Sequence, residues 1–180
     1  MKREDARPRL TLPVGQRDHM LGKESAPVTL VEYGDYECPY CLKAYPIVKK
    51  IQKQLGNKLR FVFRNFPLSR VHPQAQEAAE AAAAQDMFWE MHDYLFEHQQ
   101  ELDSGSLKKH AAALGLDTDS FNHDLDNHIL APRVREDFLS GVRSGVNGTP
   151  TFFINGFRHN GRWEAAPLLA AINKAIAGDG

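Results

Sequence analysis

Residues 28–41, VTLVEYGDYECPYC, decide the fold of this 180-residue chain. The first nine of them are rich in β-branched and aromatic side chains, which favours a strand over residues 28–36. Apolar side chains then recur at helical spacing up to a Gly-Asn stop, at Leu42, Ile47, Ile51 and Leu55. The stretch therefore predicts a strand that ends at two cysteines, with Cys38 and Cys41 in the first turn of a helix.

The rest of the chain continues in the same mixed pattern. LRFVFRNF at residues 59–66 predicts a second strand, and residues 72–144 are helical in composition and spacing. TPTFFING at 149–156 returns to extended structure with a hairpin after it, and APLLAAINKAIAG at 166–178 predicts a last helix. This order of strands and helices predicts an α/β fold.

The composition excludes two classes of protein. Hydrophobic residues make up 42% and charged residues 25%, with a net charge of -1, which is ordinary for a globular domain and unlike a nucleic-acid-binding chain. No apolar run approaches the ~20 residues that cross a bilayer, and the first twenty residues lack the apolar core of a signal peptide. The chain as given predicts a cytoplasmic protein, or an envelope protein if a signal has been removed.

The cysteine pair is better suited to chemistry than to cross-linking. Only two cysteines occur, separated by two residues, and so short a ring constrains the unfolded chain very little. A cysteine in the first turn of a helix meets unpaired N–H groups and the positive end of the helix dipole, which lowers its pKa. We therefore predict Cys38 as the attacking thiolate and Cys41 as the more buried partner, with Pro39 suited to the first helical position.

A zinc site is the alternative interpretation of the pair. Two cysteines in C-x2-C spacing form half of many zinc sites, and His123 and His128 have the spacing of a second half. A proline between the cysteines at a strand-to-helix turn favours the redox motif, however, and the histidines lie far along the chain. We expect no metal.

Five features of the sequence resemble the DsbA-like branch of the thioredoxin superfamily. They are the CPYC turn after a strand, Pro46 inside the following helix, Glu32, the Thr149-Pro150 pair, and the helical stretch between them. The resemblance implies a thioredoxin fold with an inserted all-helical subdomain. It divides the chain into an N-terminal extension at 1–25, the first part of the thioredoxin fold at 26–68, the helical insertion at 69–144 and the second part of the fold at 145–180.

The same resemblance implies roles for individual residues. Pro150 is similar to the cis-proline that faces the redox centre in this superfamily, and Thr149 before it would pair with an extended substrate. Glu32 resembles the buried acid beneath the cysteines, with a raised pKa that lets it take the proton from Cys41. Pro39 and Tyr40, between the cysteines, would border the substrate.

The expected function is thiol:disulfide exchange with thiol- or disulfide-containing proteins or peptides, with no cofactor beyond the Cys38–Cys41 disulfide. Tyr40 stands where the strongest oxidants of the family carry a histidine, so Cys38 should be less acidic than theirs. CPYC is also typical of glutaredoxins, which indicates glutathione as a candidate co-substrate. Two alternatives stay open: a glutathione transferase or isomerase of the kappa type, which needs no paired cysteines, and a non-catalytic thioredoxin-like binding module.

Overall fold

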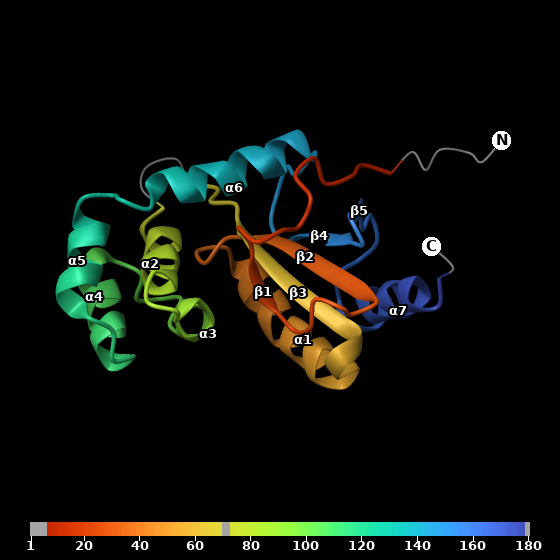
Figure 1. Ribbon diagram of the computed structural model, residues 1–180, viewed down its shortest axis with the longest axis horizontal. Helices are drawn as coiled ribbons and strands as arrows, with labels where there is room; N and C mark the ends of the chain where they lie inside the picture. The colour runs from red at the N-terminus through yellow and green to blue at the C-terminus, as the bar shows by residue number, and fades with distance from the viewer. Residues whose placement is uncertain (1–6, 70–72, 179–180) are drawn as a thin grey trace.

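The computed structural model describes residues 7–69 and 73–178, and within them the strands form one mixed sheet (Figure 1). The strand order is β1-β3-β2-β4-β5. β2 and β3 run parallel, and the other neighbouring pairs run antiparallel. The bounds are β1 His19–Leu21, β2 Val28–Gly34, β3 Leu59–Asn65, β4 Thr151–Ile154 and β5 Phe157–Arg158.

Helices cover both faces of the sheet and extend it at one end. α1 and α7 lie on one side, α6 on the other, and α2 to α5 stand together beyond the sheet (Figure 1). None of the helices in the described part of the chain is long and apolar enough to cross a membrane. The bounds are α1 Pro39–Leu55, α2 Gln74–Ala83, α3 Phe88–Glu97, α4 Ser104–Ala113, α5 Thr118–Asp126, α6 Ala131–Arg143 and α7 Ala165–Ile176.

Alternation along β2 divides the core into two clusters. Val28 and Leu30 pack with the buried stripe of α1, while Val31 and Tyr33 pack on the opposite face with Phe138 of α6. Successive strand residues point to opposite faces, so Glu32 shares the α1 face with Leu30. This alternation places a carboxyl group between the sheet and the helix that begins at the cysteines.

The predicted elements around the cysteines are present. α1 begins directly after Cys38, contains Pro46, and ends at Gly56, whose φ of 50° lies in the left-handed region that favours glycine. Its buried positions recur every three or four residues, at Cys41, Ala44, Val48 and Ile51. α2 to α6 follow β3 and precede β4, so the thioredoxin fold with an inserted helical subdomain is confirmed; its boundaries at 68 and 144 stay a prediction.

The N-terminal extension adds a strand and a bridge to the sheet. β1 pairs antiparallel with β3 at one edge of the sheet, and Arg9 forms a bridge with Phe157 at the other. The preceding Asp18 accepts hydrogen bonds of 2.8 and 3.0 Å from the guanidinium of Arg64, which is fully buried. A buried ion pair of this geometry ties the N-terminal segment to β3.

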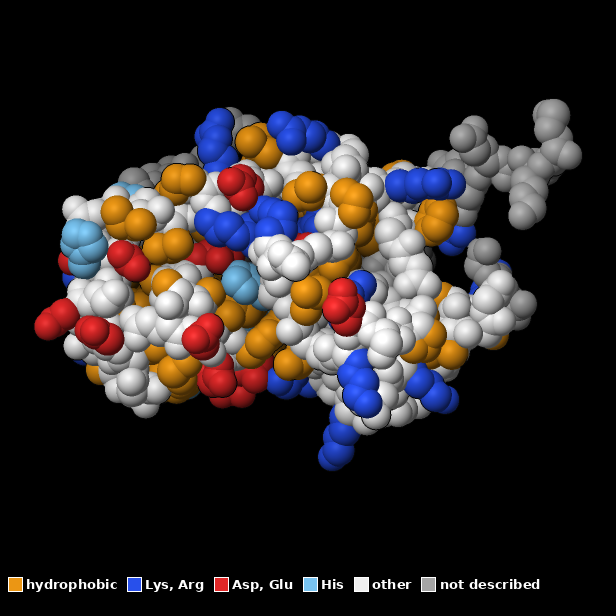
Figure 2. Space-filling model, viewed as in Figure 1, with side chains coloured by type: hydrophobic (Ala, Val, Ile, Leu, Met, Phe, Trp, Pro, Cys, Tyr) orange, Lys and Arg blue, Asp and Glu red, His pale blue; other side chains and the backbone are white. Residues whose placement is uncertain are grey.

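The charges are mixed over the visible surface. Figure 2 shows acidic side chains gathered mostly over α2 to α5, and lysine and arginine side chains mostly over α6 and the sheet.

Candidate active site

Cys38 lies at the junction of the β2–α1 turn and the helix. It is the residue before α1, with the extended φ of -80° and ψ of 122° that is usual at that position, and Pro39 follows at the start of the helix. Its side chain is close to Thr149: the Cys38 sulfur lies 3.5 Å from the Thr149 carbonyl oxygen, to which it donates only when it is protonated. The Thr149–Pro150 peptide bond is cis, as the resemblance implies. The structure thus brings the cysteine turn and the Thr149-Pro150 pair together.

Cys41 lies in the first turn of α1 and is out of contact with solvent. Both cysteines are free thiols; Cys41 is 0% exposed and Cys38 is 6% exposed. The Asp35 backbone N–H donates to the Cys41 sulfur at 3.5 Å. The predicted order of burial between the two sulfurs is therefore observed, and only Cys38 reaches the surface.

The two thiols differ strongly in acidity. A hydrogen bond from the Cys41 thiol is the largest cause that lowers the pKa of Cys38, to about 5, with burial opposing it. Thr149 and the backbone N–H groups of Cys41 and Tyr40 lower this pKa further. The helix end contributes as predicted, although the neighbouring thiol contributes more. At neutral pH Cys38 is then mainly a thiolate.

Cys41 has the opposite character. Its pKa is raised, first because its thiol donates to the Cys38 sulfur, then because it is buried, and then because the charge of Glu32 is near. Cys38 therefore keeps a small exposed surface and ionises readily, whereas Cys41 has no exposed surface and holds its proton. This asymmetry is what stepwise disulfide exchange requires.

Glu32 lies beneath the cysteines in a dry environment. It is 3% exposed, and its Oε1 atom has no hydrogen-bond partner among the described residues. Burial is the main cause that raises its pKa to about 8, and the charge of Cys38 raises it further. A carboxyl group that titrates near neutral pH beside a thiol has the property a proton acceptor needs.

Three site residues were missed by sequence reasoning. Asp35 is buried, and its carboxylate accepts from the N–H groups of Glu37 and Leu68 and from Gln76 of α2. Gln99, in the turn after α3, donates to the backbone of the cysteine turn. Asp35 follows a buried strand, and this position was a usable signal; nothing in the local sequence marks the two glutamines.

The surface beside Cys38 forms a groove. Tyr40 is 58% exposed, and Lys43 lies 5.5 Å from the centre of its ring. A groove of about 760 Å³ separates Glu37 and Pro39 from the start of α2 and from residues 99–103. The helical insertion therefore forms one wall of a groove whose other wall includes Glu37 and Pro39, the two neighbours of Cys38 in the chain.

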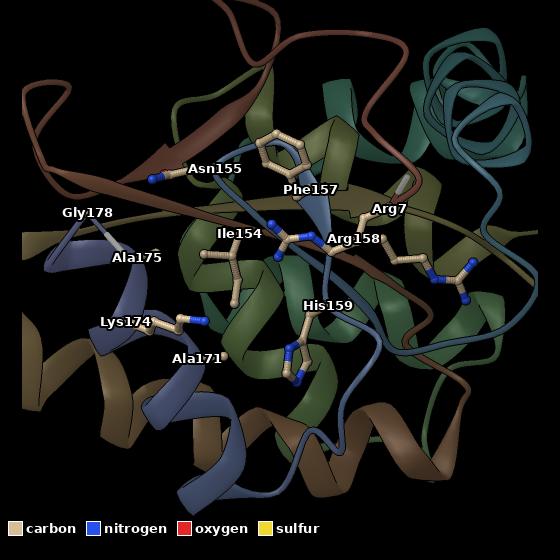
Figure 3. A pocket seen from close by; sticks show the side chains of 10 residues that line it. All are labelled: Arg7, Ile154, Asn155, Phe157, Arg158, His159, Ala171, Lys174, Ala175 and Gly178. Atoms are coloured by element: carbon tan, nitrogen blue, oxygen red, sulfur yellow. The ribbon is translucent and has the colours of Figure 1, made fainter. Parts of the chain in front are cut away.

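A second cavity lies away from the predicted site residues. It measures about 370 Å³ and is lined by α7 on one side and by β4, β5 and the N-terminal segment on the other (Figure 3). Its lining includes four basic side chains, from Arg7, Arg158, His159 and Lys174. None of the seven predicted site residues lines this cavity.

The histidines of the alternative zinc interpretation have other contacts. His123 contacts Asn127, and His128 lies 3.0 Å from the carboxylate of Glu77. Within the described residues, no group of three or more His, Cys, Asp or Glu side chains is arranged to hold a metal ion.

The sheet, the insertion and the cysteine turn define a DsbA-like thioredoxin-fold protein. Residues 15–174 match the family described as Thioredoxin, and the chain belongs to that family. Oxidised BdbD from Bacillus subtilis superposes with a TM-score of 0.83 and 27% identity, covering 96% of this chain and 97% of that one. A thioredoxin-like oxidoreductase from Silicibacter pomeroyi gives a TM-score of 0.80 and 26% identity, covering 91% and 94% of the two chains.

Curated relatives are more similar in sequence but much longer. A protein named Na(+)/H(+) antiporter NhaA 1 from Salinispora arenicola is 49% identical over 94% of this chain. A protein of the same name from Mycobacterium sp. is 44% identical over 87% of the chain. The chain spans 26% of the length of each, so most of those proteins lies outside the match.

Proposed function

We propose that this chain is a thiol:disulfide oxidoreductase whose centre is the Cys38–Cys41 pair. The observation that carries the proposal is the asymmetry of the pair: Cys38 is 6% exposed with a pKa of about 5, and Cys41 is 0% exposed with a raised pKa. A structural cysteine pair needs no such difference. The similarity to BdbD and to a thioredoxin-like oxidoreductase supports the same class of reaction.

The reaction proceeds through a mixed disulfide. In the reducing direction the Cys38 thiolate attacks a substrate disulfide, forms a bond to one substrate sulfur and releases the other as a thiolate. Cys41 then loses its proton to Glu32 and attacks the Cys38 sulfur. The Cys38–Cys41 disulfide forms, the second substrate thiol leaves, and the substrate has gained the two electrons that the cysteines have lost.

In the oxidising direction the same steps run backwards. A substrate thiolate attacks the sulfur of Cys38 in the disulfide form, and a second substrate thiol completes the exchange. Thr149 and Pro150 face Cys38 and offer backbone to an extended substrate, while Pro39 and the exposed Tyr40 border it. The reduction potential and the compartment decide the direction, and glutathione is the small thiol proposed to exchange with the pair.

Equilibration with glutathione redox buffers tests the proposal. We expect one reversible two-electron couple; a potential near or below about -230 mV would place the chain with reductants, and one above about -180 mV with oxidases or isomerases. Cys41→Ser should accumulate mixed disulfides at Cys38, and Cys38→Ser should not. If the wild-type chain shows no reversible couple, the proposal is wrong. Full activity of Cys41→Ala toward a glutathione conjugate would favour the transferase instead, and an unreactive Cys38 would favour a binding module.

A further inference from the structure

The turn that carries Cys38 is short and its backbone groups are engaged. The Cys38 N–H donates to the Asp35 carbonyl at 3.1 Å, which closes the turn over residues 35–38. The Cys38 carbonyl in turn accepts the N–H of Leu42 at 3.1 Å, the first hydrogen bond of α1. The Tyr36 carbonyl accepts neither of these bonds, and the Cys38 carbonyl oxygen has a second lone pair. Both carbonyls can therefore accept a hydrogen bond from a group outside the turn.

Gln99 of the helical insertion donates a hydrogen bond to each of these two carbonyls. Its Nε2 donates to the Tyr36 carbonyl at 2.8 Å and to the Cys38 carbonyl at 2.9 Å. A side-chain amide has two N–H donors, so these two bonds use its whole donor capacity. The amide therefore connects the two ends of the segment that positions Cys38.

Two other insertion residues hold the same turn. Gln76 of α2 donates to the Asp35 carboxylate at 2.7 Å. His92 of α3 lies 2.9 Å from the hydroxyl of Tyr36, and both side chains are buried. Contacts from three separate places in the insertion thus converge on residues 35–38, although the cysteines themselves belong to the thioredoxin part of the chain.

We propose that Gln99 is a positioning residue through which the helical insertion holds the turn that carries Cys38 and so controls the reactivity of this cysteine. The proposal rests on the proposed function and goes further, because it assigns to the insertion a role in the reaction rather than only a wall of the groove.

The physical argument concerns the donors that face the Cys38 sulfur. The N–H groups of Tyr40 and Cys41 stabilise the thiolate, and they are aimed at it only while the first turn of α1 is in place. Donors that are fixed in advance need no reorganisation when the charge develops, whereas mobile donors do. With the Gln99 bonds removed, the peptide groups at 36 and 38 gain freedom and the thiolate loses part of its stabilisation.

Gln99→Met tests the inference, because methionine keeps the length of the side chain and removes both donors. We expect the pKa of Cys38, followed by the ultraviolet absorbance of the thiolate, to rise by about half a unit, roughly threefold in proton affinity. The equilibrium with glutathione should shift about threefold toward the disulfide form, or roughly 14 mV toward a more reducing potential. Gln99→Glu, which keeps the shape and lacks the amide donors, should shift both quantities in the same direction.

Gln54→Met is the matched control. Gln54 is exposed on α1 and lies about 24 Å along the helix axis from Cys38, so neither quantity should change. If the Gln99 variants melt at a lower temperature but keep the wild-type pKa of Cys38, Gln99 is merely structural and the inference is wrong. The pKa is measured without substrate, so this failure is distinct from the absence of a redox couple, which would overturn the proposed function.

Discussion

Replacement of Glu32 by glutamine should change how the stability of the reduced protein depends on pH. Glu32 is 3% exposed, and its pKa is about 8 in the folded chain against an ordinary value of 4.5. Below pH 4.5 the carboxyl group is protonated in both the folded and the unfolded chain. Between pH 4.5 and 8 the unfolded chain releases a proton that the folded chain keeps, so the free energy of unfolding falls as pH rises.

The size of the effect follows from the same two values. Each unit of pKa difference corresponds to about 1.4 kcal/mol. The destabilisation by Glu32 should therefore reach roughly 3 kcal/mol at pH 7 and level off at roughly 5 kcal/mol above pH 8. Glutamine has the same shape and no charge, so its buried amide adds an offset that does not vary with pH. The difference between wild type and E32Q should consequently grow with pH in favour of the variant.

Urea unfolding of the reduced proteins at pH 5, 7 and 9 measures this difference. Cys38 has a lowered pKa and contributes in the opposite direction, but both proteins contain it and its contribution largely cancels. The oxidised proteins serve as a control: a disulfide has no thiolate to raise the pKa of Glu32, so the difference should be smaller. If the free energy of unfolding changes with pH in the same way in the two reduced proteins, the assignment of a raised pKa to Glu32 is refuted.

Three further outcomes are expected. Tyr40→His should lower the pKa of Cys38 by about one unit, because a protonated imidazole beside the thiolate supplies the positive charge that tyrosine lacks. The glutathione equilibrium should shift up to tenfold toward the dithiol. An unchanged titration of Cys38 would contradict this prediction. Asp18→Ala should cost about 3–5 kcal/mol in urea unfolding, since it leaves the buried Arg64 without a carboxylate partner, and a loss below about 1 kcal/mol would argue against the buried pair. Resolution of the mixed disulfide, followed by stopped flow, should be slower in E32Q than in wild type at every pH above 7, and equal rates would remove Glu32 from the proton transfer.

Local sequence signals were enough to predict the strand and the helix that meet at the two cysteines. The strand, the two cysteines and the amphipathic helix adjoin one another in the chain, so their geometry depends on residues within a few turns. The resemblance implied that Glu32 is buried, and it is. The cis bond before Pro150 was implied by the resemblance alone.

What the sequence did not reveal depends on distant pairing. β1 is only three residues long and gains its strand conformation from β3, about forty residues further on. In the sequence, nothing distinguishes Arg64 from an ordinary polar residue of a strand. Only the structure shows that Asp18 lies beside it. Gln99 is one of two adjacent glutamines in an unremarkable turn, and only the packing of α3 against the turn at 35–38 distinguishes it from Gln100.

The causes of the three shifted pKa values also order the proposed steps. While Cys38 is a thiolate, it raises the pKa of Glu32 by charge, and it raises the pKa of Cys41 by accepting its hydrogen bond. Attack on a substrate converts that thiolate into a neutral mixed disulfide and removes both effects. Glu32 then becomes a carboxylate more readily and Cys41 gives up its proton more readily, so the first step of the exchange prepares the second. Because the same two groups hold their protons until that moment, Cys41 has little tendency to react before the substrate is bound to Cys38.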